Sequence, residues 1–398
     1  METEHPENIY IPSKTSFEEK IDRVSDLYGQ QRLTLEDAAA FLDIDESEVC
    51  SLLHQRGMLP SYTVLVLGGA GFIGSNFIHR LITRHPNVRV VNYDKLTYAG
   101  NIKNLTALKD NPQHVFVQAD IANYESLRKV FETTRIDYIV NFAAETHVDR
   151  SIHGHTKDFI QTNVYGVFNI LSLIREFPVT KYVHISTDEV YGALQKDDTY
   201  LFTEEYPLSP RNPYSATKAS GDALCLSFYH TYGIPVTIVR PSNNYGPHQY
   251  PEKLVPYFVH LAQQGKPLPL YGDGKHMREW LFVRDNCAGI EKVMWQGKVG
   301  EIYNIGGGNE RENIEVARMI LHLLGKPQSL LAFTEDRLGH DRRYALDSSK
   351  IQRELAWRPE TSFEEGLADT VAWYVNNYEW ILESLRRGAL YEHYAGKK

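Results

Sequence analysis

Short apolar segments alternate with longer amphipathic segments along most of the chain after residue 61. The run Tyr62–Leu67 is apolar, rich in β-branched residues and followed by glycines, which predicts a strand buried on both faces. Similar runs predict further strands at 88–93, 115–117, 138–142, 182–185 and 236–239. Amphipathic patterns between them predict helices at 72–84, 124–133 and 214–232. Because strands and helices alternate, we expect an α/β fold with a Rossmann-type doubly wound parallel sheet.

The pattern changes on either side of this series. Residues 1–60 show a helical pattern at 33–42, with Thr34 as its expected N-cap, a turn at 43–45 and a second helical pattern at 46–56. This pair resembles a small all-α helix-turn-helix unit. After residue 240 prolines and glycines become frequent and the alternation weakens, which is typical of a smaller lobe that closes over a ligand. We therefore predict three parts, 1–60, 61–240 and 241–398.

The net charge of −9 over 398 residues is concentrated at the N-terminus. Residues 1–60 hold 5 Lys/Arg and 13 Asp/Glu, whereas the remaining residues hold 37 and 38. Phosphate contacts supply most of the affinity for DNA, so an acidic unit argues against nucleic-acid binding and favours a packing or subunit-contact role.

Apolar runs, the N-terminus and the cysteines indicate the compartment and the metal content. No apolar run approaches the roughly 18 residues of a membrane span, and the N-terminus lacks the basic start and apolar core of a signal peptide. Cys50, Cys225 and Cys287 lie far apart without metal-ligand spacing. We therefore expect a cytoplasmic protein with reduced thiols, no metal and no membrane contact.

Glycines at 68, 71 and 74 follow the first predicted strand and open a helix. Residues without a Cβ let the backbone approach a pyrophosphate, which then lies at the helix N-terminus. Asp94 ends the next strand, 20 residues after Gly74. A carboxylate there accepts hydrogen bonds from the adenosine ribose and repels a 2′-phosphate, so the pattern favours NAD over NADP.

The ends of the third and fourth strands extend this predicted cofactor site. Asp120, followed by Ile121, either contacts the adenine amine or caps the next helix, and the sequence leaves both interpretations open. Ala143 and Ala144 are small enough to leave room for the cofactor. His147 follows them, at the edge of the sheet where such folds bind ligands.

Two further motifs carry the predicted chemistry. Tyr214 and Lys218 stand at i and i+4 on a helix and share one face, so a neighbouring ammonium and a nicotinamide cation favour the phenolate as a base. Asp188 and Glu189 follow Thr187 past the fifth strand, and in an extended segment they would point to opposite sides. A simple dehydrogenase needs no such carboxylate pair, so the pair indicates oxidation coupled to dehydration.

Together these motifs resemble the nucleotide-sugar branch of the extended short-chain dehydrogenase/reductase family, and more narrowly the dTDP-glucose 4,6-dehydratases. The resemblance extends from about residue 62 to about residue 380. Besides the motifs above, it rests on the stretches 94–101, 143–151, 242–254, 269–274 and 336–344. The acidic unit 1–60 lies outside the family pattern.

The resemblance implies a mechanism. Tyr214 takes the proton of the C4 hydroxyl while hydride passes from C4 to NAD, with Thr187 hydrogen-bonded to the same oxygen and Lys218 supporting the phenolate. Glu189 then removes the C5 proton, and protonated Asp188 gives its proton to the departing C6 hydroxyl. Return of the hydride to C6 gives a 4-keto-6-deoxy sugar, and NAD stays bound.

The resemblance also implies the binding residues and the assembly. The NAD set is Gly68, Gly71, Phe72, Ile73, Gly74, Asp94, Lys95, Thr97, Asp120, Ile121, Ala143, Ala144, Tyr214 and Lys218. The substrate set is His147, Asn243, Lys253, Leu254, Pro269, Tyr271, Arg278, Asn313, Arg337 and His340. Residues 61–240 would then be the NAD-binding Rossmann domain and 241–398 mainly the nucleotide-sugar-binding lobe. Family members are generally homodimers through paired helices, here 159–176 and 214–232, and serve deoxysugar or surface-polysaccharide biosynthesis.

Three alternatives stay open. The same catalytic residues would serve UDP-GlcNAc or UDP-glucose, because the sequence does not identify the base or the C2 substituent. A 4-epimerase shares the Gly-rich loop and Tyr-x-x-x-Lys but typically lacks the Asp-Glu pair. A regulator that senses NAD or a nucleotide sugar and binds DNA through residues 1–60 would not need the full catalytic set.

Overall fold

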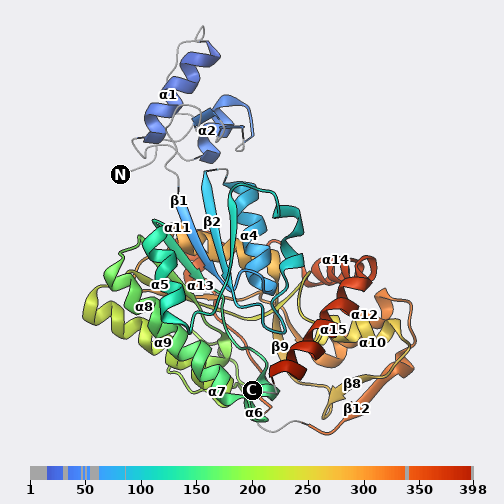
Figure 1. Ribbon diagram of the computed structural model, residues 1–398. Coiled ribbons are helices and arrows are strands. Elements are labelled where there is room, and N and C mark those ends of the chain that lie inside the picture. Colours follow the sequence, from blue (N-terminus) through green and yellow to red (C-terminus); the bar gives the residue numbers. More distant parts are fainter. Residues whose placement is uncertain are drawn as a thin grey trace.

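The computed structural model describes residues 16–29, 35–45, 48–49, 52–53, 62–85, 87–336 and 340–395. The body is built on a seven-stranded sheet in the order β10-β6-β5-β4-β1-β2-β3, with every neighbouring pair parallel (Figure 1). Its strands are β1 (Tyr62–Leu67), β2 (Val88–Asp94), β3 (His114–Gln118), β4 (Tyr138–Asn141), β5 (Lys181–Ile185), β6 (Val236–Pro241) and β10 (Ile302–Ile305). The predicted α/β fold with a doubly wound parallel sheet is confirmed.

Helices cover both faces of this sheet. One face packs against α4 (Phe72–Arg84), α11 (Val283–Gln296) and α13 (Ser349–Leu355), and the other against α5 (Tyr124–Thr133), α8 (Val167–Glu176) and α9 (Pro213–Tyr232). Side chains of β1 alternate between the two cores, with Val64 and Val66 in the first and Leu65 and Leu67 in the second. Burial on both faces explains why this strand is apolar without alternation.

Helix α9 carries two of the predicted catalytic residues and is fixed at both ends. Asn212 and Ser215 form a capping box, with Pro213 in the first turn, where its missing N–H is not needed. The helix ends at Gly233, whose φ of +69° lies in the left-handed region. Short helical turns fill the connections: η2 (Ile102–Leu108), α6 (Val148–Ile152), α7 (Thr156–Phe159), the π-helical η3 (Ile160–Gly166), η4 (Asp188–Tyr191) and η5 (Gln328–Leu330).

A smaller lobe with its own core lies beside the carboxyl end of the sheet. Its strands are β7 (Asn243–Tyr245), β9 (Met277–Phe282) and β11 (Glu310–Glu312) in one sheet, and β8 (Leu268–Tyr271) and β12 (Leu331–Thr334) in another. Its helices are α10 (Leu254–Gln263), α12 (Asn313–Leu323), α14 (Phe363–Asn376) and α15 (Tyr378–Ala395). The lobe is not one continuous segment, because β10 and α11 return to the main sheet from beyond residue 240.

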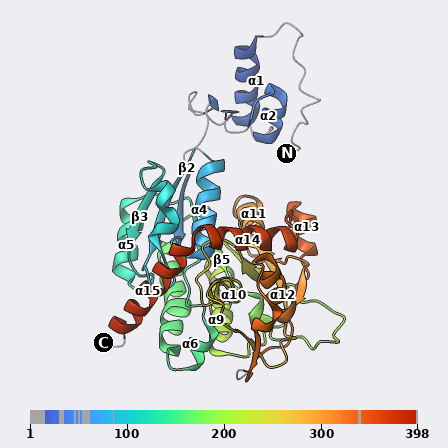
Figure 2. The same ribbon diagram turned by 90° about the vertical axis from the view of Figure 1, so that its right-hand side faces the viewer.

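The N-terminal unit stands apart from the body in both views (Figures 1 and 2). It contains α1 (Phe17–Gly29) and α2 (Leu35–Leu42), and the described residues at 48–49 and 52–53 are also helical. Ile21, Val24, Leu27, Ala38, Ala39, Leu42, Val49 and Leu53 form its core. The predicted cap Thr34, Cys50 and much of the predicted helix at 46–56 lie outside the described residues. None of the described helices is long and apolar enough to cross a bilayer.

Candidate active site

The Gly-rich loop between β1 and α4 is packed too tightly for side chains. Gly68 has φ +77°, and a Cβ there would lie 2.5 Å from the backbone nitrogen of Ala143. A Cβ on Gly74 would overlap the carbonyl oxygen of Gly68. The bare backbone at the N-terminus of α4 therefore fits a pyrophosphate.

Asp94 joins this loop to the segment that follows β2. Its Oδ2 accepts a hydrogen bond from the backbone N–H of Ala70 (2.9 Å), and its Oδ1 accepts one from Leu96 (2.7 Å). Burial raises the pKa of Asp94, while these hydrogen bonds and the charge of Arg387 act against the rise. The carboxylate is thus held at the carboxyl end of β2, where a ribose would lie.

Asp120 is held by different contacts from those of a helix cap. Its Oδ2 lies 2.6 Å from Lys95 Nζ, and its Oδ1 accepts a hydrogen bond from the N–H of Ala122 (2.9 Å). The N-cap of α5 is Asn123, whose side chain accepts from Ser126. The interpretation of Asp120 as the cap of this helix is therefore wrong. The other interpretation, a contact with the adenine amine, stays a prediction.

These elements surround a cavity of about 300 Å³ at the carboxyl end of the sheet. Every residue predicted to bind NAD or to act in catalysis lines it. They are Gly68, Gly71, Phe72, Ile73, Gly74, Asp94, Lys95, Thr97, Asp120, Ile121, Ala143, Ala144, Thr187, Asp188, Glu189, Tyr214 and Lys218. The donor set and the glycine cradle fit a dinucleotide.

The segment that carries the two carboxylates differs from the prediction. Thr187 is extended (φ −157°, ψ 155°), but Asp188 begins the 3₁₀ helix η4, so the expected extended segment is wrong. Consecutive residues in a 3₁₀ helix point about 120° apart rather than to opposite sides. The Thr187 side chain accepts from the N–H of Glu189 (3.3 Å) and starts this turn. As a result Asp188 is buried and Glu189 is partly exposed.

Asp188 has the surroundings of a neutral acid. Thr187 Oγ1 donates to its Oδ1 (3.1 Å), while its Oδ2 is buried without a hydrogen-bond partner among the described residues. Burial raises the pKa of Asp188 well above its ordinary value, and the charges of Glu189 and Glu279 raise it further. Glu189 accepts a hydrogen bond from Asn212 Nδ2 (3.3 Å).

Tyr214 and Lys218 are buried on α9. Burial raises the pKa of Tyr214, the charge of Glu189 adds to the rise, and a hydrogen bond with Thr187 lowers it. Lys218 Nζ donates to the carbonyl oxygen of Ile185 (2.6 Å). Burial lowers the pKa of Lys218 to about 8, with the charge of Asp222 acting in the opposite direction.

A buried polar network behind Lys218 was not predicted. Asp222 lies one further turn along α9 and accepts from Arg240 Nε (2.9 Å), and both side chains are almost fully buried. Arg240 also donates to the hydroxyl of Tyr191 (2.8 Å), which in turn donates to Asn304 (2.8 Å). The network ties α9 to β6, η4 and β10 around the catalytic residues.

A second cavity of about 790 Å³ continues from the first into the smaller lobe. Asn243, Asn244, Gln249, Tyr250, Glu252 and Lys253 line both cavities. The described members of the predicted substrate set all line it: His147, Asn243, Lys253, Leu254, Pro269, Tyr271, Arg278, Asn313 and His340. Arg337 lies outside the described residues. Leu385, Gly388 and Ala389 of α15 also line this cavity, and no motif marked them in the sequence.

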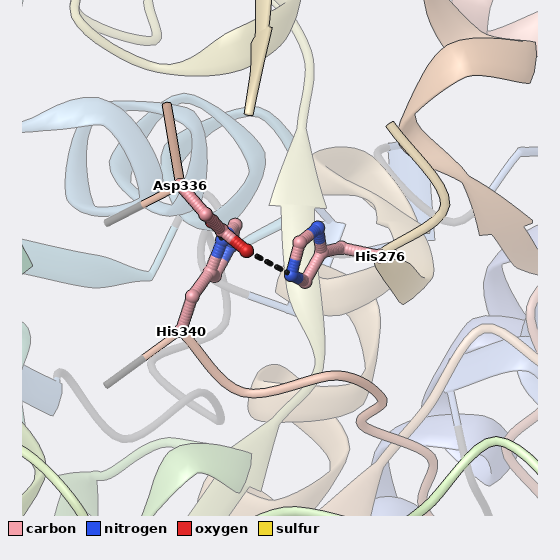
Figure 3. Close-up of side chains that lie close together, drawn as sticks. All are labelled: His276, Asp336 and His340. Carbon is pink, nitrogen blue, oxygen red and sulfur yellow. Dashed lines mark hydrogen bonds and ion pairs between the residues drawn. The ribbon is translucent and has the colours of Figure 1, made fainter. Parts of the chain in front are cut away.

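His340, which lines this cavity, clusters with His276 and Asp336, although no metal-ligand group was predicted (Figure 3). Asp336 accepts from His340 Nδ1 (2.6 Å) and lies 3.2 Å from His276 Nε2. The imidazoles are stacked, with centroids 3.6 Å apart and planes at 16°. A metal lies in the plane of each imidazole at about 2.0–2.1 Å from its nitrogen, and two nearly parallel planes cannot share such an ion. The cluster fits protons shared between one carboxylate and two imidazoles.

Comparisons with known proteins match most of the chain. The sequence model of the family described as GDP-mannose 4,6 dehydratase matches residues 65–370. A dTDP-glucose 4,6-dehydratase of Xanthomonas campestris pv. campestris (strain B100) is 49% identical over 337 residues, which cover 80% of this chain and 95% of that protein.

Solved structures agree with this match. The dTDP-glucose 4,6-dehydratase of Bacillus anthracis str. Ames, in complex with NAD, has a TM-score of 0.76 and 47% identity over 81% of this chain and 99% of that chain. A UDP-glucose 4-epimerase of Thermotoga maritima with UDP-glucose has a TM-score of 0.74 but 28% identity, over 79% of this chain and 99% of that chain. The shared fold is therefore common to both activities, whereas sequence identity is much higher to the dehydratase.

Proposed function

The chain belongs to the GDP-mannose 4,6 dehydratase family, and from this premise we propose that it is an NAD-dependent enzyme that converts dTDP-glucose to dTDP-4-keto-6-deoxyglucose. The family resemblance predicted from the motifs is confirmed by the match over residues 65–370. The thymidine base and the glucose unit come from the names of relatives at 49% and 47% identity. Such a product serves deoxysugar biosynthesis.

In this proposal the Gly-rich loop and Asp94 hold the cofactor, and Tyr214 is the base at the C4 hydroxyl. Bound NAD supplies removal of hydride from C4 and its return to C6. Since burial raises the pKa of Tyr214, proton removal needs positive charge nearby, which protonated Lys218 and the nicotinamide ring provide. Thr187, hydrogen-bonded to Tyr214, is placed to contact the same substrate oxygen.

The adjacent carboxylates divide the elimination between them. The C4 ketone acidifies the C5 hydrogen, and Glu189, which is partly exposed to the cavity, removes it as the base. Asp188, kept protonated by burial, gives its proton to the C6 hydroxyl as the C–O bond breaks. Opposite protonation states on neighbouring residues follow from their different burial.

The observation that carries the proposal is that Asp188 and Glu189 line the same cavity as Tyr214 and the Gly-rich loop. The test incubates the enzyme separately with dTDP-glucose, UDP-glucose, UDP-GlcNAc and CDP-glucose and follows product mass. Loss of one water from dTDP-glucose, without accumulation of NADH, is expected. Water loss from another member would correct the substrate, and isomerisation without mass change would replace the dehydratase with an epimerase.

We further propose a homodimer built through η3, α8 and α9. Four large apolar side chains on these elements are exposed: Ile160 (52%), Tyr165 (46%), Phe168 (42%) and Tyr232 (50%). Exposed apolar side chains concentrated on adjacent helices are typical of subunit contacts. A cytoplasmic location is part of the same proposal and is supported by the free, buried thiols of Cys225 and Cys287. We expect no DNA binding by the acidic N-terminal unit.

A further inference from the structure

The C-terminal helix α15 contacts residues 98–104, here called the cofactor loop, and lies beyond the stretch that the family model matches. The family match ends at residue 370, whereas α15 spans Tyr378–Ala395. In Figure 2, α15 continues from α14 and crosses the molecule toward the C-terminus. Trp380 and Arg387 of α15 donate hydrogen bonds to residues 98–104, the segment that follows Asp94.

Arg387 makes the central contact of α15 with this segment. Its guanidinium donates hydrogen bonds to the backbone carbonyl oxygens of Gly100 and Tyr98, the latter at 3.3 Å. About two turns earlier along α15, Trp380 Nε1 donates to Asn104 Oδ1 (2.9 Å). An exposed ion pair between Glu383 and Lys103 (2.6 Å) lies between them. Because hydrogen bonds from a charged donor to partly buried carbonyls are stronger than an exposed ion pair, Arg387 makes the stronger contact.

The same segment holds the cofactor cradle on its other side. The N–H of Asn101 (2.8 Å) and the Asn104 side chain (3.1 Å) both donate to the carbonyl oxygen of Ala70 in the Gly-rich loop. The N–H of Ala70 donates to Asp94 (2.9 Å), and a Cβ on Gly100 would lie 2.9 Å from Asp94 Oδ1. The charge of Arg387 also lowers the pKa of Asp94 against the effect of burial. Arg387 thus supports residues 98–104, which help to position Asp94, the predicted ribose-binding carboxylate.

Other residues of α15, next to Arg387 in the sequence, reach the substrate cavity. Leu385, Gly388 and Ala389 line it, and Gly388 packs directly against the hydroxyl of Tyr250, a residue that lines both cavities. The helix therefore spans the cofactor loop and the substrate cavity at the place where the two meet.

We propose that α15 is a strap over the cofactor loop, in which Arg387 is a positioning residue that keeps NAD bound between the two hydride transfers. The inference rests on the proposed function, since hydride taken from C4 must return to the same sugar. A cofactor that left as NADH would strand the 4-keto intermediate. Residues 98–104 are held by α15 as well as by the Gly-rich loop, so they open less often than they would with the Gly-rich loop alone.

The test replaces Arg387 with Met and uses Arg386→Met as the matched control. Arg386 is the neighbouring residue, is exposed and pairs with Glu379 on the same helix rather than with the loop. Purified wild-type protein and both variants are assayed for NAD and NADH content by chromatography after denaturation, and the NAD-stripped proteins are titrated with NAD by calorimetry. Arg387→Met is expected to lose most of its bound cofactor and to bind NAD roughly 10- to 100-fold more weakly, since two charge-assisted hydrogen bonds are lost. Arg386→Met should match wild type, and Arg387→Lys should recover part of the affinity.

Two further readings separate a positioning role from general damage. Affinity for dTDP, which occupies the second cavity in the proposed function, should stay within about twofold in Arg387→Met because Arg387 does not line that cavity. Equal loss of dTDP and NAD affinity, or unchanged NAD affinity in Arg387→Met, would overturn the inference. A wild-type protein that neither carries nor binds NAD would instead overturn the proposed function.

Discussion

At the scale of single residues, the different roles proposed for the two adjacent carboxylates rest on a difference in burial. Asp188 is 2% exposed and has one oxygen without a hydrogen-bond partner among the described residues. Glu189 is partly exposed and accepts from Asn212. Since desolvation disfavours the charged form of a carboxyl group, the buried member suits the proposed role of acid and the more exposed member that of base.

Glu189→Gln should separate oxidation from elimination. The variant keeps Tyr214, Thr187 and Lys218, so C4 is still oxidised, but C5 deprotonation loses its base. Water loss should fall by at least about 100-fold while absorbance at about 340 nm shows accumulated NADH. Exposed Glu205→Gln is the control and should behave as wild type. Full product formation by Glu189→Gln would remove Glu189 from the mechanism.

Asp188→Asn should abolish most of the elimination and yet stabilise the protein at neutral pH. The folded-state pKa of Asp188 lies well above its ordinary value of 3.8, so the folded state prefers the protonated form. That contribution to stability is complete below pH 3.8 and is lost as pH rises through the folded-state pKa. The Asn side chain does not ionise, so the variant does not lose stability in this way as pH rises.

Urea unfolding at a series of pH values checks this expectation. The free energy of unfolding of Asp188→Asn minus that of wild type should be near zero around pH 4 and should grow as pH increases. Exposed Asp197→Asn serves as the control. A difference independent of pH would contradict the neutral-acid assignment.

Local motifs marked residues that line the first cavity, but not the residues that support them. Gly68, Asp94 and Tyr214 each sit at a recognisable spacing from a strand or helix end. Arg240 and Arg387 bind groups 18 and 287 positions away in sequence, so no periodicity marks them. The direction of the Asp188 pKa likewise depends on burial that only the folded chain creates.

At the scale of elements, helices and strands with long regular patterns were predicted well and short irregular turns were not. The predicted helix at 72–84 matches α4, and the strand at 62–67 matches β1. By contrast, the segment after β5 turns into η4 because Thr187 caps it, and Gly192 then ends it with φ +92°. The predicted helix at 159–176 contains the π-helical η3, whose Gly166 packs against Ile121. Such departures are set by tertiary contacts rather than by propensity.

Arg240→Met should destabilise the junction of α9, β6 and η4. It leaves Asp222 buried without its cation, which typically costs about 3–5 kcal/mol in the free energy of unfolding. The double variant Asp222→Asn with Arg240→Met removes both charges and should recover part of that loss.

Chemical denaturation of the single and double variants measures this coupling. Arg128→Met, which removes exposed ion pairs with Glu132 and Glu176, is the control and should leave the unfolding midpoint nearly unchanged. A loss of less than about 1 kcal/mol in Arg240→Met would show that the network contributes little. Asp222→Asn should also lower the pKa of Lys218 below about 8, because the charge of Asp222 raises it.

At the scale of the whole molecule, the doubly wound sheet follows from the alternating pattern, whereas the division into lobes does not. The predicted strands ended at residue 239, but the sheet is completed by β10 at Ile302–Ile305, after a long excursion into the smaller lobe. The edge strand is only four residues long and its neighbours in sequence are rich in glycine. A short strand that pairs with β6 across such a distance has no local signature.

Phe168→Glu should convert the proposed dimer to a monomer. Phe168 stacks near Tyr165 on the exposed side of η3 and α8, and a buried carboxylate there would oppose association. Light scattering during gel filtration at micromolar concentration should report half the mass of wild type. Phe333→Glu, at a still more exposed site on β12, should leave the mass unchanged. A wild-type monomer would contradict the proposed assembly.

Removal of residues 1–60 should leave the dehydratase intact. The first described residue that lines either cavity is Gly68, and the apolar residues of α1 and α2 pack into a core of their own. We therefore expect kcat/KM for dTDP-glucose to stay within about twofold, since distant sites that share no contacts act independently. The melting temperature of the body should also be retained.

The outcome of that truncation decides what the acidic unit is for. If activity is kept but the mass in solution changes, residues 1–60 act in assembly, which their net charge of −8 would make sensitive to salt. If activity falls with the dimer intact, the unit acts on the catalytic body. A DNA gel shift that is present in the full chain, weakens steeply with salt and is lost on truncation would restore the regulatory alternative, against the expectation from its charge.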